Sequence, residues 1–558
     1  MVNERVHVCQ PALRHVCLTP PRLVRAGEDG GVTLAGGASR WASLTISVGA
    51  TIPLMLSFSA QTRAANLARM AEDRFDVLVI GGGITGVGIA LDAASRGFSV
   101  ALAEKDDFAS GTSGRSSRLI HGGFRYLEHR DFGLVHEALR ERKILLRLAP
   151  HLVRPIPMYK QAESLPSRAL YRAGLTGYDL LAAGRNVGLH RSVRAERVRE
   201  AVPGFGGRSR GFRYFECQTD DARLTIEVAR TAQACGAVLA NHARAEGLLG
   251  GARVEGAAVV DELTGQRFEI RARATVNAGG VWADRVRGMA AAGRERLVPS
   301  KGVHLVFAPG AVRTKVGVVA PSAAHDGRFV FLIPWEDRVY AGTTDTAYAG
   351  DLEDPAVDDS DREYILSAVA QYFPAVTERD VVASWAGLRP LLSRDNAPAD
   401  VRTRDLSRRH AVFEDPPGLF TITGGKLTTY RAMAEDLVDR IADALGAAGR
   451  CRTRNIALGL HGSPGEALRL ATAEVARLRL PPRVGARIVQ RYGDDWREAV
   501  RMISEDQPLG EPVVDGLPVL NVEVELARSR EMAITDEDVF VRRTRLTAFG
   551  TSVKPSAR

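Results

Sequence analysis

The stretch from Phe75 to Lys105 constrains the fold of this chain more than any other part of the sequence. It begins with a short apolar, β-branched run, Val77 to Ile80, which is typical of a strand buried on both faces of a parallel sheet. Gly81, Gly83 and Gly86 follow with the spacing G-x-G-x-x-G. The first glycine permits a tight turn, the second lets a pyrophosphate approach the backbone, and the third lets the next helix pack closely on the strand.

The residues after this turn complete the pattern of a dinucleotide site. The next helix would point its unpaired N–H groups at the phosphates. A second strand, Phe98 to Ala103, ends at Glu104, and an acid about 20 residues after the turn accepts hydrogen bonds from a ribose hydroxyl. This order favours a dinucleotide site over an empty α/β unit with a glycine-rich turn. The stretch by itself fits a nicotinamide cofactor as well as a flavin.

Length and charge limit the remaining possibilities. A chain of 558 residues exceeds a single hydrophobic core, so two or three domains are expected. Lys and Arg outnumber Asp and Glu by 75 to 66, a net charge of +9, which suits an anionic membrane surface, anionic substrates or nucleic acid. The arginines are scattered among acids, and no basic run is interleaved with aromatic residues. We therefore expect no nucleic-acid partner.

The cysteines show no C-x-x-C spacing, so the sequence indicates neither a zinc site nor a disulfide framework. No metal is expected, and a reducing compartment such as the cytoplasm fits. The five cysteines are Cys9, Cys17, Cys217, Cys235 and Cys451.

The first seventy residues do not fit the dinucleotide pattern. Trp41 to Thr62 carries no charge, and its length approaches the roughly 20 residues of a membrane span, but Ser, Thr, Gly and Pro53 make it poorly apolar. A signal peptide is a second interpretation, because Ser57 to Ala60 resembles a cleavage site. The favoured interpretation is that residues 1–70 are a disordered or wrongly assigned extension and that translation begins at Met70.

Patterns further along the chain predict an α/β fold in which the dinucleotide domain is interrupted. Asp131 to Leu152 has the periodicity of an amphipathic helix. Between Val303 and Thr344 several β-rich runs predict an antiparallel sheet inserted into the first domain. From Leu419 a strand, a Gly-Gly turn and a long helix indicate a return to that domain, and the remainder predicts a helical domain. The expected segments are 71–155, 216–295 and 385–454 for the cofactor domain, 156–215 for a substrate or cap region, 296–384 for the substrate sheet and 455–558 for the helical domain.

Several separate motifs together resemble those of a known protein family. Gly111 to His129 reads GTSGRSSRLIHGGFRYLEH, and further motifs are KGVHLVF from Lys301, FLIPW, AGTTDTAY, WAGLRPL, TRD, GGKLTTYRAMAE and VRRTRL. In this order they resemble the FAD-dependent, aerobic glycerol-3-phosphate dehydrogenases, respiratory enzymes within the D-amino-acid-oxidase-like flavoproteins. The resemblance spans Phe75 to the C-terminus. It implies a Rossmann-type FAD-binding domain, an inserted substrate sheet and a C-terminal helical domain.

The resemblance also implies which residues contact FAD. A planar ring needs close backbone approach, which suits the small residues beside it. Gly279 departs from the family's usual Asn-Ala-Thr-Gly, so one hydroxyl contact is in doubt. The implied cofactor residues are Gly81, Gly82, Gly83, Thr85, Gly86, Glu104, Lys105, Ser116, Ser117, His121, Gly122, Gly123, Asn277, Gly279, Gly425, Lys426, Leu427 and Thr428.

The implied substrate, glycerol 3-phosphate, is a dianion, and a cluster of cations suits its phosphate. His304 is expected to accept the C2 hydroxyl proton while the C2 hydride passes to flavin N5. Arg389, in an apolar frame, is expected to be buried with an anionic partner. Lys426 is expected either to bind phosphate or to stabilise negative charge on the reduced flavin. The implied substrate residues are Arg125, Tyr126, His304, Thr344, Arg389, Arg404 and Lys426, with His304, Arg389 and Lys426 catalytic.

The family implies oxidation to dihydroxyacetone phosphate, with electrons passing to ubiquinone or menaquinone. It also implies a cytoplasmic enzyme that contacts the inner face of the cell membrane peripherally, and it allows a homodimer. Alternatives are a glycerol-3-phosphate oxidase that uses O2, an amine or amino-acid oxidase of the same fold group, and a regulatory or nucleic-acid-binding protein that keeps the nucleotide fold without the enzyme activity. The amino-acid oxidase predicts one carboxylate-binding arginine in place of a cation cluster.

Overall fold

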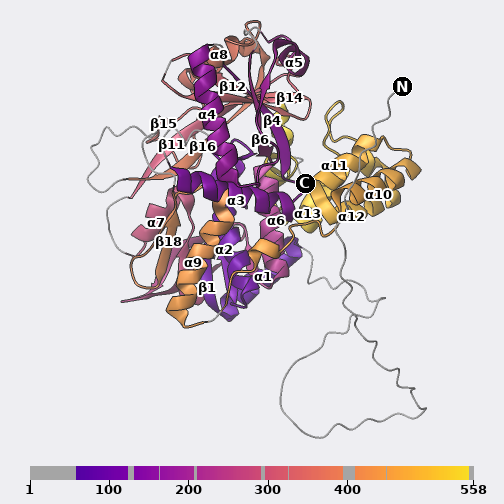
Figure 1. The fold of residues 1–558 in the computed structure, drawn as a ribbon. Coiled ribbons are helices and arrows are strands. Elements are labelled where there is room, and N and C mark those ends of the chain that lie inside the picture. The colour runs from indigo at the N-terminus through magenta and orange to yellow at the C-terminus, as the bar shows by residue number, and fades with distance from the viewer. Residues whose placement is uncertain are drawn as a thin grey trace, which may run out of the picture. The chain divides into compact units, whose positions relative to one another are not determined.

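The computed structural model describes residues 58–123, 131–162, 164–205, 210–290, 296–324, 326–393, 409–447 and 449–551. They form two sheets with flanking helices and a group of C-terminal helices (Figure 1). This architecture confirms the predicted fold class, a Rossmann-type unit with an inserted, mainly antiparallel sheet and a helical C-terminal domain.

The first sheet holds the dinucleotide motif at its centre. Its parallel core runs β18-β10-β1-β2-β7, with Val77 opposite Val100 on one side and Ala274 on the other. Strands β17, β9 and β8 extend it by antiparallel pairing. The strands are β1 (Arg74–Ile80), β2 (Val100–Ala103), β7 (Val238–Ala240), β8 (Ala243–Gly250), β9 (Val254–Asp261), β10 (Arg267–Asn277), β17 (Ala411–Glu414) and β18 (Leu419–Thr423).

Both faces of β1 are buried, as the sequence predicts. Val77 and Val79 pack in a cluster with residues of the helices on one face, whereas Leu78 and Ile80 pack in a second cluster on the other. In Figure 1 α2 and α9 lie beside β1. The helices of this unit are α2 (Ile84–Ser95), α3 (Phe132–Leu148), α6 (Asp221–Ala234), α7 (Ala283–Gly288) and α9 (Tyr430–Leu445).

A helix before Met70 corrects the expectation that the fold starts there. Helix α1 (Ala60–Glu72) contributes Met70, which is fully buried, to the cluster around Leu78. Arg63 forms an ion pair with Asp261, and its Nε donates to Asn241 O at 2.9 Å. Residues 58–69 are therefore part of the folded unit, because β1 needs cover on its second face. The expectation for residues 1–57 lies outside the described residues.

The second sheet is antiparallel except where β4 and β12 run parallel. Its main order is β15-β11-β14-β13-β12-β4-β6-β3, with β16 on β11 and β5 on β6. The strands are β3 (Leu119–Ile120), β4 (Arg154–Gln161), β5 (Arg191–Val193), β6 (Gly211–Gln218), β11 (Leu297–Phe307), β12 (Gly317–Pro321), β13 (Phe329–Trp335), β14 (Arg338–Gly342), β15 (Thr346–Ala347) and β16 (Val381–Leu392). Helices α4 (Leu165–Ala182), α5 (Ala195–Ala201) and α8 (Asp359–Ala370) belong to the same unit.

Two segments lie in a different sheet from the one expected. Strand β16 pairs with β11 from Leu392 to Val381, so the return to the cofactor domain assigned at residue 385 is wrong. Strand β3, expected in the cofactor domain, pairs with β6 of the second sheet. A local sequence pattern does not specify the sheet in which a segment finds its pairing partner.

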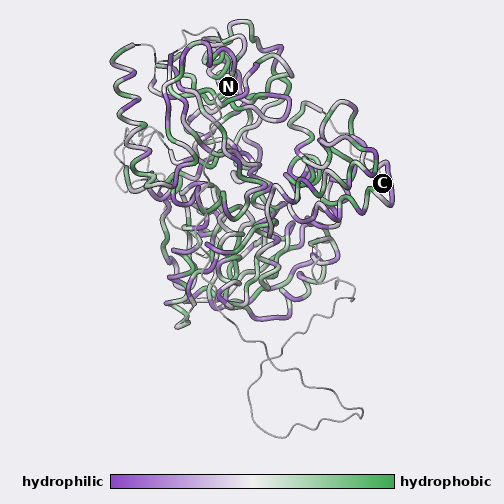
Figure 2. Tube along the Cα trace, turned by 45° about the vertical axis from the view of Figure 1, so that its right-hand side comes forward, coloured by the Kyte–Doolittle hydropathy of each residue, from purple (hydrophilic) through white to green (hydrophobic). Residues whose placement is uncertain are grey.

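The C-terminal helices form their own hydrophobic cluster. Green and purple segments alternate along most of the trace in Figure 2, as expected for elements with one buried face. Within the described part of the chain, no helix is both long and apolar enough to cross a membrane. The elements are α10 (Pro464–Arg477), α11 (Pro482–Tyr492), α12 (Trp496–Glu505), α13 (Asn521–Arg530), the π-helical turn η11 (Asp538–Arg543) and the short helix η12 (Leu546–Phe549).

Candidate active site

A cavity of about 910 Å³ is lined by residues of both sheets. It extends from the glycine turn after β1 to His304 on β11. Of the residues implied by the resemblance, those that line it are Gly81, Gly83, Thr85, Glu104, Lys105, Ser116, Ser117, His121, Gly123, Gly279, His304, Arg389, Gly425, Lys426, Leu427 and Thr428.

The glycine turn leaves no room for side chains. Gly81 has φ +115°, and a Cβ there would lie 2.6 Å from Ala278 O. A Cβ on Gly86 would lie 1.9 Å from Gly81 O, so α2 can approach β1 only with glycine at this position. Gly83 is the N-cap of α2, whose first N–H groups therefore begin at the cavity.

Glu104 ends β2 at the cavity wall. Its carboxylate accepts from Gly82 N at 2.5 Å and from Asp106 N at 2.9 Å. Burial nevertheless raises the pKa of Glu104 to about 7. The next residue, Lys105, lies 4.3 Å from the ring centre of Trp282.

Five of the implied residues do not line the cavity, and their contacts explain why. Gly82 and Gly86 lie within the turn and serve its packing. Gly122 faces Tyr178, whose hydroxyl would be 2.2 Å from an added Cβ. Asn277 is fully buried and its Oδ1 accepts from Gly279 N at 3.1 Å, so it shapes the turn. Thr344 Oγ1 accepts from Val303 N at 3.1 Å.

Ser116 and Ser117 lie where the cavity meets β11. Ser117 Oγ is 2.8 Å from His304 Nε2. Ser116 donates through both N and Oγ to Asp221 Oδ2, at 2.8 and 2.6 Å. The sequence motif therefore supplies one serine for the histidine and one for a buried carboxylate.

His304 is held in a fixed orientation and kept neutral. Its ring stacks on Trp385 with centroids 4.7 Å apart and planes 11° apart. A Cβ on Gly342 would lie 2.2 Å from His304 Cδ2, so this close approach requires glycine. Burial, together with the positive charges of Arg389 and Arg118, lowers the pKa of His304 well below its usual value.

Arg389 lies beside His304 on the same face of the second sheet. Its guanidinium donates to Thr343 Oγ1 at 3.1 Å and lies 3.6 Å from Asp345 Oδ1. The expected anionic partner is therefore present, but the side chain is 20% exposed and so only partly buried. A Cβ on Gly302 would lie 2.4 Å from Arg389 Nη2, which shows that glycine makes room for this arginine.

Of the remaining residues implied to bind substrate, the structure describes Lys426 but not Arg125, Tyr126 or Arg404. Lys426 lines the cavity after Gly424 and Gly425, which have φ +76°.

Several cavity residues were missed by the sequence reasoning. Thr343 and Asp345 line it instead of Thr344, and the motif AGTTDTAY contains all three. Trp282 and Ser113 line the dinucleotide end, and Ser113 Oγ accepts from Ile84 N at 2.9 Å. An apolar wall had no signal in the sequence, because it combines residues of five elements: Leu119, Tyr171, Leu175, Tyr214, Val319, Phe329 and Phe331.

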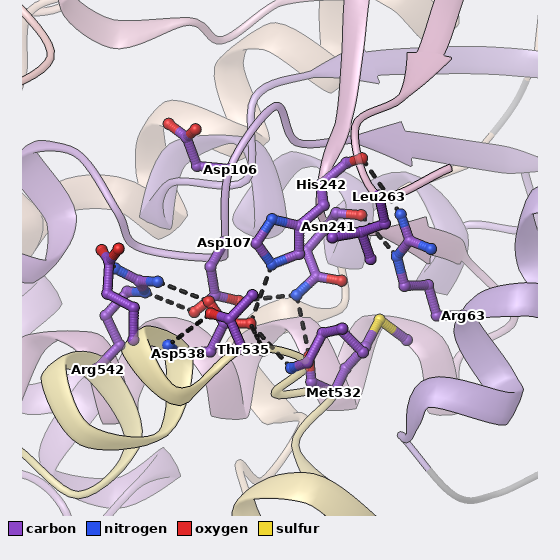
Figure 3. Close-up of polar contacts among 12 residues, drawn as sticks. Arg63, Asp106, Asp107, Asn241, His242, Leu263, Met532, Thr535, Asp538 and Arg542 are labelled. Carbon is purple, nitrogen blue, oxygen red and sulfur yellow. Dashed lines mark hydrogen bonds and ion pairs between the residues drawn. The ribbon is translucent and has the colours of Figure 1, made fainter. Parts of the chain in front are cut away.

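A cluster of potential metal ligands lies outside this cavity. One atom each of Asp107, His242 and Asp538 fall within 4.8 Å of one another. Figure 3 shows Arg542 pointing at both carboxylates, with Nε 2.6 Å from Asp107 and Nη2 2.6 Å from Asp538. The carboxylates already bind guanidinium groups, so this cluster is an ion-pair network that attaches the C-terminal segment to β2 and β7.

Comparisons with known proteins identify the chain. Residues 76–440 match the family model described as FAD dependent oxidoreductase, and residues 451–556 match the C-terminal domain of alpha-glycerophosphate oxidase. The chain belongs to the FAD-dependent oxidoreductases, and FAD is its cofactor.

Similar proteins show which family of FAD-dependent oxidoreductases the chain belongs to. Glycerol-3-phosphate dehydrogenase 1 of Mycobacterium bovis is 40% identical in an alignment 522 residues long that covers 89% of this chain and 96% of that protein. A mitochondrial glycerol-3-phosphate dehydrogenase of Arabidopsis thaliana is 36% identical over 94% of this chain and 87% of its own. The FAD complex of the Bacillus halodurans glycerol-3-phosphate dehydrogenase has a TM-score of 0.72 at 34% identity, covering 88% of this chain and 90% of that one. The chain is a member of the FAD-dependent glycerol-3-phosphate dehydrogenase family.

The cavity fits the cofactor that this family binds. Gly81 leaves no room for a side chain beside Ala278 O, and Gly83 starts α2 at the cavity, where a pyrophosphate is expected. Glu104 stands at the end of β2, where a ribose hydroxyl is expected. The volume continues beyond this dinucleotide end to Ser117 and His304, which leaves room for a ring system.

Proposed function

We propose that this protein oxidises sn-glycerol 3-phosphate to dihydroxyacetone phosphate and passes the electrons to a membrane quinone. The family membership supports the substrate. The observation that carries the proposal is the pairing of His304 with Ser117 at one end of the FAD cavity, with Arg389 and Lys426 lining the same cavity.

The cations that line the cavity are proposed to bind the phosphate of the substrate. Arg389 lines the cavity, where its guanidinium also donates to Thr343 Oγ1 and Thr344 O, and Lys426 adds a second positive charge. Arg125, Tyr126 and Arg404 belong to the same proposal as further ligands. A dianion in this place would be recognised by several cations in concert.

His304 and Ser117 are proposed to accept the proton of the C2 hydroxyl. When bound, FAD supplies the two-electron acceptor for the hydrogen on C2. The neutral imidazole can take the hydroxyl proton along the hydrogen bond that joins Nε2 to Ser117 Oγ. A substrate dianion would offset the charge of Arg389, one cause of the low pKa of His304, and so make the imidazole a stronger base in the complex.

The apolar wall of the cavity supports a quinone as acceptor. Tyr171 and Leu175 of α4 contribute to it together with Phe329 and Phe331 of β13. An apolar, planar acceptor is better suited to these side chains than a charged one.

Helix α4 supports peripheral contact with the cytoplasmic membrane. Leu165, Leu170 and Leu180 are 75%, 70% and 74% exposed, while Leu175 of the same helix faces the cavity. Arg168 and Arg172 lie on the same helix. Exposed leucines beside basic residues suit an anionic lipid surface.

Other acceptors and substrates have less support. The L-alpha-glycerophosphate oxidase of Mycoplasma pneumoniae is 18% identical with a TM-score of 0.52, which indicates a shared fold alone. The glycine oxidase of Geobacillus kaustophilus is 22% identical and likewise shares the fold.

The test is an anaerobic titration of the purified FAD-loaded protein. Glycerol 3-phosphate should bleach the flavin absorbance, and glycine should not. A quinone analogue should then restore the absorbance faster than air does, with little peroxide. Stoichiometric peroxide and fast recovery in air would favour the oxidase, and bleaching by glycine alone would exclude the proposed substrate.

A further inference from the structure

The segment Ser116–Ser117 is held against the second sheet through its carbonyl groups. Tyr340 OH donates to Ser117 O at 2.9 Å, and Trp385 Nε1 donates to Ser116 O at 3.3 Å. Tyr340 and Trp385 are also the rings around His304. The second sheet therefore fixes the backbone of the segment on the side of His304.

The opposite side of the segment is held by the carboxylate of Asp221. One oxygen, Oδ2, accepts from both Ser116 N and Ser116 Oγ. The other oxygen, Oδ1, accepts from Ala222 N at 3.0 Å and forms an ion pair with Arg545. Asp221 is fully buried at the start of α6, so its orientation depends on these partners.

Arg545 reaches this carboxylate from the C-terminal domain. It lies between η11 and η12 with φ +61° and is 4% exposed. Its Nη1 donates to Gly114 O at 2.9 Å, and its Nε and Nη2 donate to Asp220 Oδ1 at 3.2 and 3.1 Å. One guanidinium therefore binds a carbonyl group and two carboxylates, a geometry that a lysine cannot reproduce.

The positive charge of Arg545 lies beside the carboxylates of Asp220 and Asp221. Burial alone would raise the pKa of Asp220, but Arg545, Arg491 and Arg118 hold it far below its usual value. Both acids at the start of α6 are thus partners of the arginine. Loss of Arg545 would leave buried carboxylates with fewer donors, and Asp221 could then turn away from Ser116.

From these contacts we infer that Arg545 is a positioning residue for the dehydrogenation. Through Asp221 it fixes Ser116, and the fixed segment keeps Ser117 Oγ on His304 Nε2. The inference rests on the proposed role of the Ser117–His304 pair. It gives the C-terminal domain a part in the active site although Arg545 does not line the cavity.

A positioning role makes a specific kinetic prediction. Arg389 and Lys426, the described residues proposed to bind phosphate, are not partners of Arg545, so substrate affinity should change little. Displacement of Ser117 by a fraction of an ångström to an ångström should instead slow the chemical step, by about 10- to 100-fold.

The experiment measures flavin reduction by stopped flow in the FAD-loaded full-length protein. The variants are Arg545→Met, Arg545→Lys and the isosteric Asp221→Asn, each normalised to bound FAD. Arg543→Met is the matched control, because Arg543 is fully buried two positions earlier and attaches the same segment through Asp107 instead.

The inference predicts that Arg545→Met and Asp221→Asn lower the limiting reduction rate by about tenfold or more, with the substrate Kd within about twofold. Arg545→Lys should recover part of the rate, and Arg543→Met should leave the rate per flavin unchanged. Wild-type rates in FAD-loaded Asp221→Asn would overturn the inference even if Arg545→Met fails to fold. An equal loss in Arg543→Met would also overturn it. Unchanged reduction in His304→Asn would instead contradict the proposed function.

Discussion

His304 Nε2 and Ser117 Oγ lie 2.8 Å apart although the two residues are 187 positions apart in the chain. The other ring nitrogen, Nδ1, is buried and has no hydrogen-bond partner among the described residues. Among the described residues, the imidazole therefore has one hydrogen-bond partner, the Ser117 hydroxyl, which lines the cavity.

Replacing His304 with asparagine should lower the limiting rate of flavin reduction by about 10²- to 10⁴-fold, since a general base contributes on that scale. FAD binding should persist because the dinucleotide end of the cavity is untouched. Stopped-flow reduction by glycerol 3-phosphate measures the effect. His190→Asn is the control, because His190 pairs with Asp179 and does not line the cavity; similar losses in both variants would count against His304 as the base.

Replacing Arg118 with methionine should move the acid limb of the kcat/KM profile to higher pH. The Arg118 guanidinium lies 4.6 Å from the Trp385 ring centre, and its charge lowers the pKa of His304. Removal of that charge stabilises the imidazolium, so more of the base is protonated at low pH. The Arg118→Lys profile should stay closer to wild type, because the positive charge is kept. An unmoved or downward-shifted limb would contradict this role.

Replacing Arg389 with methionine should raise KM for glycerol 3-phosphate by about 10- to 100-fold, because hydrogen bonds to a charged group contribute about 1.5–3 kcal/mol. Arg389→Lys should raise it less. Steady-state kinetics with a quinone analogue provide the measurement. Arg440→Met serves as the control, since Arg440 is 50% exposed beside Asp436. An unchanged KM would remove Arg389 from the phosphate site.

The ion pair between His242 and Asp538 should make stability depend on pH. Burial opposes the charged imidazole, but the hydrogen bond to Asp538 raises the pKa of His242 overall. Because the pKa of His242 is higher in the folded state, the ion pair contributes its full stability below the unfolded pKa of about 6.5. This contribution is lost as the pH rises through the folded pKa. His242→Gln should therefore cost about 1–3 kcal/mol at pH 6 and less at pH 9. Denaturant unfolding at both pH values checks it, and an equal cost at both would refute the linkage.

Replacing Leu170 and Leu180 of α4 with serine should weaken binding to anionic vesicles by about tenfold or more, since each buried leucine contributes roughly 1.5–3 kcal/mol. Reduction of the flavin in solution should be unaffected. Vesicle sedimentation measures the binding. Leu468→Ser on α10, 41% exposed, is the control; unchanged sedimentation of the α4 variant would exclude this helix as the membrane contact.

The sequence predicted the elements whose signals are local. The turn at Gly81 needs positive φ, and Gly86 has to admit α2, so glycine spacing alone identified the dinucleotide end. Alternation and length indicated the strands. The prediction failed where strand pairing matters: the segment with the motif WAGLRPL was assigned to the cofactor domain, but it forms β16 of the second sheet.

By itself, then, the sequence determined the glycine turn, because backbone conformation and periodicity depend on neighbours a few positions away. Its motifs were also enough for the resemblance to the family. Only the tertiary structure decided that α1 covers β1, that Ser117 meets His304, and that Arg545 reaches Asp221 across 324 positions. Such contacts depend on the path of the whole chain. No local preference encodes which carboxylate a buried guanidinium will meet.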